Sequence, residues 1–181
     1  MRGLGTIINV LAIMAGGILG IVCKRFLKDR YQETIMKATG ISVVFLGAAG
    51  MLTKMLVVSP DGSLTTQGSM TMILSLAIGA LAGEIINIDA QFERFGEWLK
   101  HKTGSDGDKK FTTGFVSASL TVSIGAMAVI GSIQDGIYGD YTTLVAKAIL
   151  DFIIVFIMAS AMGKGCVFSF LPVGILQGSM T

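Results

Sequence analysis

A long run without charge constrains this chain more than any other feature. Between Arg2 and Lys24 there is no Asp, Glu, Lys or Arg. About twenty apolar residues are enough for a helix to cross the hydrocarbon core of a bilayer. A secretory signal has a shorter apolar region with its basic cluster in front, whereas here the basic residues follow. This run therefore predicts a first membrane-spanning helix.

The composition of the whole chain agrees with a membrane protein. Of the 181 residues, 52% are hydrophobic and 14% are charged, and the mean hydropathy is +0.73. These values exclude disorder and disfavour a water-soluble fold. The 24 glycines fit membrane helices, where small residues let backbones approach closely. A formal net charge of +2 gives no reason to expect a nucleic-acid partner, so the expected partner is the lipid bilayer.

Further apolar segments follow the first one along the chain. They lie at about residues 38–58, 69–88, 111–133, 142–162 and 165–181. Each is separated from the next by a turn or by a cluster of charged residues, and most are long enough to span the hydrocarbon core of a bilayer. The sequence therefore predicts an all-α, polytopic transmembrane helical bundle of about six spans.

The stretch between the third and fourth spans has a different pattern. Apolar residues recur at helical spacing opposite charged ones, as in a helix that lies in the interface; they are Ile88, Phe92, Phe95 and Leu99. Residues 102–110, KTGSDGDKK, are a polar linker. We therefore expect a first membrane half at 1–101, a cytoplasmic linker at 102–110 and a second half at 111–181. The second half is still apolar at Thr181, which suggests truncation.

The basic residues predict the orientation of the chain. Eleven of the 14 Lys and Arg residues fall in the loops after spans one, three and five, which six alternating spans place on one side. By the positive-inside rule that side is the cytoplasm. We therefore expect a multi-pass protein of the bacterial cytoplasmic (inner) membrane with its N-terminus outside.

The sequence contains a trace of internal repetition. The pentapeptide QGSMT occurs at 67–71 and again at 177–181, and the same offset places Lys37 over Lys147. A repeat unit with three spans would give two copies in opposite orientations, an inverted three-plus-three repeat as in some transporters. The alternative is coincidence, because the rest of the two halves aligns poorly.

Asp151 is the sharpest functional candidate, with Lys147 beside it. Asp151 lies near the middle of the fifth span, where a carboxylate costs about 2.5 to 3.5 kcal/mol on insertion scales and should face the bundle interior or a wet cavity. Lys147 is four residues earlier, a spacing that allows an ion pair on one helix face. The pair fits a gate, a proton or cation site, or a structural neutralisation that locks helices together.

Three further polar residues are weaker candidates for a transport pathway. Glu84 lies near the end of the third span, where a boundary position is the simpler interpretation. Asn9 lies in the first span on a stripe of small residues that favours helix packing. Asp135, with Asp140, is expected in the turn between spans four and five, where Asp-Gly is ordinary turn chemistry; a cation-attracting vestibule is the alternative.

Small residues mark helix contacts, and enzyme motifs are missing from the sequence. Gly16 and Gly20 form a GxxxG pattern, as do Gly79 and Gly83, and such glycine-rich faces also allow a homo-oligomer. His101 is the only histidine, and neither HExxH, a phosphate-binding glycine loop nor GxSxG occurs. We therefore expect no enzyme, no cofactor and no metal site.

Several blocks resemble a known family. They are GTIINVLAIMAGGILG in the first span, GEIINIDAQFERFGEWLK from Gly83, GAMAVIGSIQDGIYGD from Gly125, AKAILDF from Ala146, and LPVGILQGSMT at the end. In this order they are similar to the bacterial membrane family catalogued as domain of unknown function 554. The resemblance covers essentially the whole chain and implies a bacterial cytoplasmic-membrane protein, sometimes described as a transporter. It implies no substrate and no functional residues, and members usually continue past the last block.

Together these features favour membrane transport of a small solute or ion, by a secondary transporter or channel-like facilitator, with Asp151 in the pathway. The alternative is a non-transporting membrane scaffold or partner subunit, in which buried polar groups only specify helix packing. An intramembrane enzyme ranks third, because Asp151 has no comparably buried carboxylate to form a catalytic pair.

Overall fold

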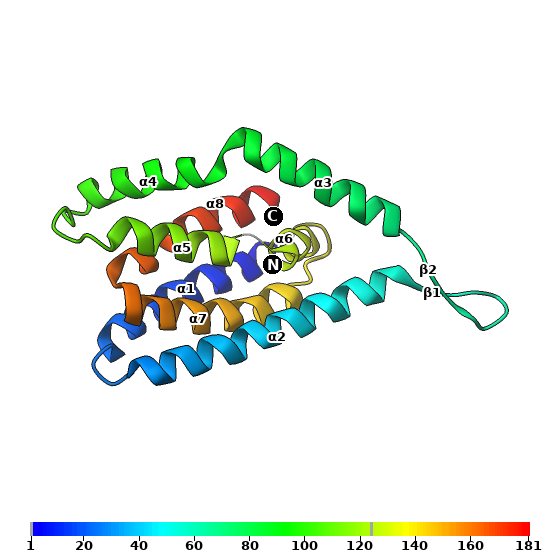
Figure 1. Cartoon of the computed structure of the whole chain (residues 1–181), viewed down its shortest axis with the longest axis horizontal. Helices are drawn as coiled ribbons and strands as arrows, with labels where there is room; N and C mark the ends of the chain where they lie inside the picture. The colour runs from blue at the N-terminus through cyan, green and yellow to red at the C-terminus, as the bar shows by residue number, and fades with distance from the viewer. Residues whose placement is uncertain (1, 124) are drawn as a thin grey trace. The chain divides into compact units, whose positions relative to one another are not determined.

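The structure, a computed structural model, describes residues 2–123 and 125–181 and is almost entirely helical (Figure 1). Its elements are α1 Leu4–Cys23, α2 Asp29–Met55, β1 Leu56–Val58, β2 Leu64–Thr66, α3 Ser69–Ile86, α4 Ile88–Lys102, α5 Phe111–Ser123, α6 Ala126–Tyr138, α7 Thr142–Met162, the 3₁₀ helix η1 Lys164–Ser169 and α8 Phe170–Met180. In this described part, α1, α2, α3 and α7 are long and apolar enough to cross a membrane, and α5 with α6 makes a fifth span if the bent pair counts as one. The predicted all-α membrane bundle is confirmed, with a span count close to six.

The contacts group the chain into two compact units. Unit 1 contains Met1–Met36 and Phe92–Thr181, and unit 2 contains Lys37–Gln91. Each unit is described by itself below. The predicted halves on either side of the linker stay a prediction.

The most extensive helix packing in unit 1 is between α1 and α7. The glycines of α1 allow it, because a Cβ added at Gly16 would lie 2.6 Å from the carbonyl oxygen of Phe152, and one at Gly20 would collide with that of Phe156. Two backbones therefore touch along this seam, as small-residue faces allow in membrane helices. The structure confirms that this GxxxG face is a helix contact.

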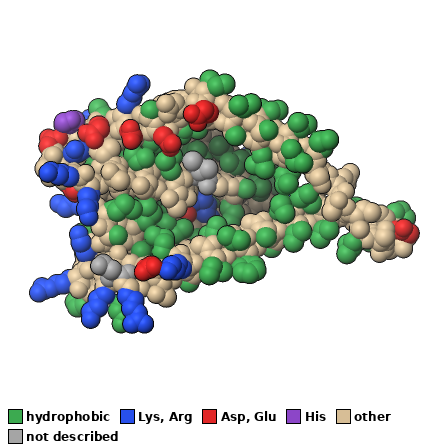
Figure 2. Space-filling model, in the orientation of Figure 1, with side chains coloured by type: hydrophobic (Ala, Val, Ile, Leu, Met, Phe, Trp, Pro, Cys, Tyr) green, Lys and Arg blue, Asp and Glu red, His purple; other side chains and the backbone are tan. Residues whose placement is uncertain are grey.

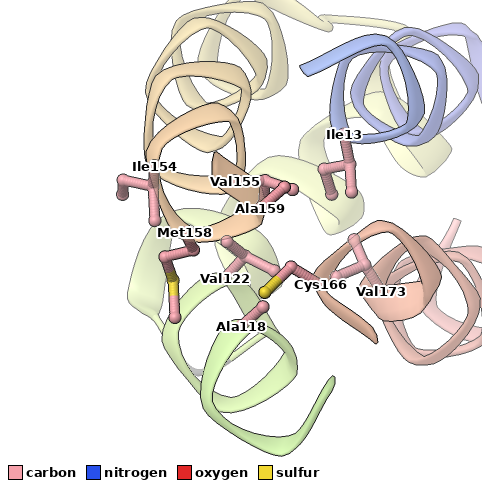
Figure 3. Packing of buried hydrophobic residues seen from close by; sticks show 9 residues of the cluster. All are labelled: Ile13, Ala118, Val122, Ile154, Val155, Met158, Ala159, Cys166 and Val173. Atoms are coloured by element: carbon pink, nitrogen blue, oxygen red, sulfur yellow. The ribbon is translucent and has the colours of Figure 1, made fainter. Parts of the chain in front are cut away.

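The hydrophobic core of unit 1 lies beside that seam. Side chains from α1, α5, α7, η1 and α8 pack into one hydrophobic cluster (Figure 3). Its buried members are Ile13, Ala118, Val122, Ile154, Val155, Met158, Ala159, Cys166 and Val173. Segments far apart in the sequence thus form one core. The core holds α5 and α7 together at the level of the candidate site.

The helix α4 is amphipathic, as the spacing of its apolar residues predicts. Its apolar face packs on α5, where Leu99 is buried with Phe111 and Phe115. Gly96 lets the two helices approach, since a Cβ there would lie 2.8 Å from the ring of Phe115. The opposite face carries the charged residues, as expected of a helix at the interface.

The predicted fourth span, 111–133, is not one straight helix. It consists of α5 and α6, which meet at 60°. Gly125 precedes α6 with an extended backbone, at φ −174° and ψ 143°. The sequence pattern shows an uninterrupted apolar run, and apolarity alone does not reveal such a break. Glycine is a poor helix former, which makes this a suitable place for one.

The predicted sixth span, 165–181, is also shorter than expected. Its first part is the 3₁₀ helix η1, and α8 has only 11 residues. At 1.5 Å per residue α8 is about 16 Å long, well short of a hydrocarbon core of about 30 Å. Gly163, at φ 91°, ends α7, and a Cβ at Gly165 would collide with the backbone of Phe111. The first residues of the predicted span therefore form a 3₁₀ helix packed closely against α5.

Unit 2 begins within α2, which starts at Asp29 rather than near residue 38 and ends at Met55. Residues 56–58 were expected to finish the span but form β1, which pairs antiparallel with β2 in the register Val57 opposite Thr65. β-branched residues favour this extended form. Residues 59–62 form the turn that follows β1, with Gly62 at φ 79°.

The helix α3 packs very differently from α1. Among the residues that the structure describes, none of its side chains is buried, and no atom lies within 4 Å of a Cβ added at Gly79 or Gly83. Hydrophobic side chains cover the surface of α2 and α3 (Figure 2). The second GxxxG pattern thus has no helix against it in the described chain.

A buried ion pair at a broken span

The candidate site of unit 1 centres on Lys147 and Asp151. Both lie on α7, one helical turn apart, and their side chains are 7% and 5% exposed. The Lys147 ammonium donates a hydrogen bond to Asp151 Oδ2. The predicted ion pair is therefore formed, and it is formed inside the bundle. A buried pair of this kind needs further hydrogen bonds to offset its desolvation.

The break between α5 and α6 supplies one of these hydrogen bonds. Lys147 Nζ also donates to the carbonyl oxygen of Val122, at 2.7 Å. Because α5 ends at Ser123, the carbonyls of its last turn have no partner within the helix. The C-terminal end of a helix also carries partial negative charge, which attracts an ammonium. The cation therefore sits between a carboxylate and the end of a helix.

Asn9 extends the polar site to the first helix. It is fully buried, and its amide lies close to the Asp151 carboxylate. Its Nδ2 also donates to Gln177 Oε1 of α8, at 3.2 Å. Gln177, Asn9, Asp151 and Lys147 thus form a polar chain that ends at α5 and links four helices.

Sequence reasoning missed Gln177 as a site residue. It is the one amide in the apolar stretch 165–181, and a buried amide in such a stretch needs a partner. That requirement, together with Asn9 in the first span, could have indicated the contact. The residue entered the sequence argument only as part of the repeated pentapeptide.

Some buried polar atoms of α1, α5 and α8 lack a hydrogen-bond partner in the described protein. They are Asn9 Oδ1, Ser119 Oγ, Ser123 Oγ and Gln177 Nε2. Ser119 and Ser123 are four residues apart and therefore lie on one face of α5. Buried polar atoms are usually paired with protein or with ordered water.

Asp135 is the clearest correction to the sequence analysis. It was expected in the turn between spans four and five, but it lies within α6 and is fully buried. Its Oδ2 accepts a hydrogen bond from the backbone N–H of Gly5 at 2.8 Å. The helix continues past the Asp-Gly pair because Gly136 packs on the backbone of Thr181, 2.5 Å from an added Cβ. Asp135 therefore caps the N-terminus of α1, where a carboxylate is stabilised by free N–H groups.

The remaining candidates lie elsewhere. Glu84 belongs to α3 in unit 2, where its side chain is exposed near the helix end. Asp140 is exposed before α7 and accepts hydrogen bonds from the backbone and hydroxyl of Thr142, which is turn and cap chemistry as expected. Within the described ranges, no three His, Cys, Asp or Glu side chains group to hold a metal ion, and Cys23 and Cys166 are free thiols.

An ion pair buried among long apolar helices defines a helical membrane protein. The chain belongs to the family described as "Protein of unknown function (DUF554)", whose family model matches residues 4–181. This confirms the resemblance seen in the sequence.

Two curated relatives extend the comparison. The chain is 33% identical over 176 residues to "Uncharacterized membrane protein YdfK" of Bacillus subtilis (strain 168), covering 97% of this chain and 70% of that protein. It is 24% identical over 178 residues to "Uncharacterized protein YqgA" of Escherichia coli (strain K12), covering 96% of this chain and 71% of that protein. No solved structure matches.

Proposed function

We propose that this protein transports a small solute or ion across the membrane, with Asp151 and Lys147 in the pathway. The observation that carries the proposal is the position of the pair at the break between α5 and α6. Non-helical backbone within a membrane occurs where it is buried in protein or lines a cavity. In many transporters the ends of such discontinuous helices bind the coupled ion or substrate.

The unpaired polar atoms support the same function. A pair that served only to neutralise itself would be expected among fully satisfied groups. In unit 1 the hydroxyls of Ser119 and Ser123 and the side-chain oxygen of Asn9 are buried without partners among the described residues. Such groups give a passing solute or ion somewhere to bind, at the cost of stability while the site is empty.

We place the protein in the bacterial cytoplasmic membrane as a multi-pass protein with its N-terminus outside. Three basic loops support this orientation, because the ends of α1, α4 and α7 with their Lys and Arg residues lie at the same end of unit 1 (Figures 1 and 2). The basic residues there include Lys24, Arg25, Lys100, Lys102 and Lys164. By the positive-inside rule this end faces the cytoplasm.

An inverted repeat would fit this function. An offset of 110 residues places α2 over α7 and α1 over the α5–α6 pair. The repeated pentapeptide, however, opens α3 in one copy and closes α8 in the other. The repeat therefore stays a prediction, as do the absence of enzymatic activity and a homo-oligomer through glycine-rich helix faces.

The second candidate function is a membrane scaffold or partner subunit. It is favoured by the uncovered apolar surfaces of α2 and α3, which a partner protein could cover as well as lipid. In this case the polar chain of Asn9 and Gln177 only fixes how α1 and α8 pack. Asp151→Asn would then alter assembly or have no effect.

Transport is tested with the full-length protein in proteoliposomes that contain a pH-sensitive dye. Small metabolites and cations are added outside, and flux is compared for wild type and Asp151→Asn. We expect solute-dependent proton or ion movement in the wild type and its loss in the variant, with helicity and expression unchanged. Asp140→Asn, which changes an exposed carboxylate outside the pair, is the matched control and should transport normally.

A broad panel without flux from correctly oriented, folded wild type would contradict transport and favour the scaffold. Normal flux from Asp151→Asn would contradict the role of the ion pair. These two results separate the function from its assigned site.

A further inference from the structure

One side of α4 carries a row of basic and aromatic side chains. Arg94, Trp98 and Lys102 are four residues apart along the helix and therefore share one face. All three residues are exposed, Trp98 by 52%. The Lys102 ammonium lies over the Trp98 ring, 5.1 Å from its centroid. These three residues, called the basic stripe below, present a guanidinium, an indole and an ammonium on one surface.

The contacts of α4 show where the basic stripe lies. The apolar face of α4 packs on α5 through Leu99, and Gly96 lies against the ring of Phe115. Trp98 stacks on Phe95 at the edge of that apolar face, with ring centroids 5.6 Å apart. The basic stripe therefore borders the apolar face of an amphipathic helix. Tryptophan prefers such a border at a membrane surface, where its ring lies at the level of the lipid headgroups.

The charges of the basic stripe are not neutralised by α4 itself. The acidic residues of this helix recur at the same spacing on another side of it; they are Asp89, Glu93 and Glu97. Glu97 pairs instead with Lys100, at 3.7 Å. Among the residues that the structure describes, neither Arg94 nor Lys102 forms an ion pair with a carboxylate. Two positive charges beside an exposed indole are thus available to a partner from outside the chain.

We propose that the basic stripe binds an anionic phospholipid, with Arg94 and Lys102 on the phosphate and Trp98 against the glycerol and the upper acyl chain. The planar guanidinium of arginine forks onto two phosphate oxygens, and the ammonium of lysine adds a point charge. This inference concerns a second site of unit 1 and does not depend on transport.

The chemistry of the basic stripe favours an anionic lipid over a zwitterionic lipid or a soluble phosphate. Basic residues at a membrane surface are attracted to lipids with a net negative charge. The cationic headgroup of phosphatidylcholine, by contrast, would meet two like charges. A soluble phosphate would make no use of the indole at the centre of the stripe, whereas a lipid chain covers its apolar ring.

The experiment uses Trp98 as a reporter inside the site, because it is the single tryptophan of the 181 residues. The full-length protein is reconstituted in phosphatidylcholine vesicles with a small fraction of lipid brominated in its upper acyl chain, either phosphatidylglycerol or phosphatidylcholine. Bromine quenches tryptophan fluorescence on contact, so the ratio of quenching by the two lipids measures the preference at Trp98. Emission that remains in Trp98→Phe is subtracted. Because each basic residue near anionic lipid contributes about fivefold in binding, we expect wild type to prefer phosphatidylglycerol about tenfold or more.

Variants of α4 test the two basic residues. Arg94→Gln and Lys102→Gln should each lower the preference about fivefold, and the double variant should bring it close to one. Arg94→Lys, which keeps the charge without the fork, should lose less than Arg94→Gln. The matched control is Lys100→Gln, which removes the same charge from the same helix, at a lysine paired with Glu97 on another side; it should keep the preference of wild type. Circular dichroism checks the fold of each variant.

Three results would overturn the inference. The first is equal quenching of wild type by the two brominated lipids. The second is an equal loss of preference in Lys100→Gln and Lys102→Gln, because the preference would then follow the net charge of the surface and not the basic stripe. The third is displacement of brominated phosphatidylglycerol by an equal concentration of soluble glycerol phosphate, which would exclude a lipid as the occupant. A preference that falls only in the Arg94 and Lys102 variants supports the lipid site, whether or not the vesicles show solute flux.

Discussion

The two units have similar apolar helices but very different interiors. In unit 1 the backbone of α7 packs directly against the glycines of α1, and four helices share a buried polar chain. In unit 2 the glycines of α3 meet nothing, and its side chains are exposed within the part of the chain that the structure describes. Apolar composition therefore identifies helices suited to a membrane, but it does not tell which of them pack on protein.

The difference follows from the solvent. In lipid, an apolar side chain gains little by moving from lipid to a neighbouring helix, so packing depends on small residues and buried polar groups. Unit 1 has both at matching positions, whereas α3 has glycines without polar partners. Substitutions at equivalent residue types in the two units should therefore have unequal effects.

The largest difference between the units in the effect of a substitution on stability is expected for lysine. Lys147→Met leaves Asp151 buried without its counter-ion, and breaking a buried pair in this way costs about 3–5 kcal/mol. Lys54→Met changes an exposed lysine at the end of α2 and should change stability little. The measurement is the free energy of unfolding by denaturant in detergent, followed by helicity.

A double variant tests the cause of that loss. Replacing Asp151 with Leu in the Lys147→Met background removes the stranded charge, so most of the lost stability should return. If the double variant is no more stable than Lys147→Met, the loss comes from packing and not from an unpaired carboxylate.

The next largest difference in the effect on stability is expected for glycine substitutions. In Gly16→Ala the new Cβ would press on the Phe152 carbonyl oxygen, and overpacking of this kind costs about 1–3 kcal/mol. In Gly79→Ala nothing lies near the new Cβ, and alanine favours a helix by up to about 1 kcal/mol. Thermal unfolding should show a lower Tm for the first variant and an equal or higher Tm for the second. Equal losses in both would mean that α3 is packed as tightly as α1.

A smaller difference in the effect on stability is expected when carboxyl groups are removed. Asp135→Ala removes the cap from the N-terminus of α1, and loss of a cap costs about 0.5–2 kcal/mol. Glu84→Ala changes an exposed side chain of α3 and should stay within about 0.5 kcal/mol of wild type. Hydrogen exchange of the first turn of α1 should rise in Asp135→Ala alone. Unchanged exchange there would exclude the capping role.

The sequence predicted α1, α3, α4 and α7 closely because each is defined by local information. The span at 142–162 coincides with α7, and the i,i+4 spacing of Lys147 and Asp151 depends only on helix geometry. Periodicity of apolar residues likewise sufficed for α4.

Long-range contacts explain what the sequence could not predict. The local sequence around Asp135 is that of a turn. The contact that buries it, a hydrogen bond from the backbone N–H of Gly5, comes from 130 positions away. The helix α6 runs through the predicted turn, where Gly136 packs on Thr181, and close packing of Gly165 on Phe111 lies at the start of the predicted sixth span. Hydropathy reports only how apolar a segment is, so it gave a straight fourth span and a full sixth one.

The smallest effect is expected at two exposed carboxylates, one in each unit. Glu97 of α4 accepts a hydrogen bond from the Thr112 hydroxyl of α5, at 2.6 Å, which lowers the pKa of Glu97. Asp61 accepts from the hydroxyl and backbone of Ser63, which lowers the pKa of Asp61. The first bond joins two helices, whereas the second closes within one turn.

Thr112→Ala should therefore raise the pKa of Glu97 towards its ordinary value and leave that of Asp61 unchanged, and Ser63→Ala should do the reverse. A lowered carboxyl pKa contributes stability that is present above the unfolded-state pKa and is lost as pH falls through the folded-state value. Because the Glu97 bond depends on the packing of α4 against α5, acid should weaken that contact in wild type and less so in Thr112→Ala. NMR titration of the labelled carboxyl carbons measures both shifts. If disrupting α4–α5 packing at Gly96 raised the pKa of Asp61 as much as that of Glu97, the two carboxylates would not report on separate units.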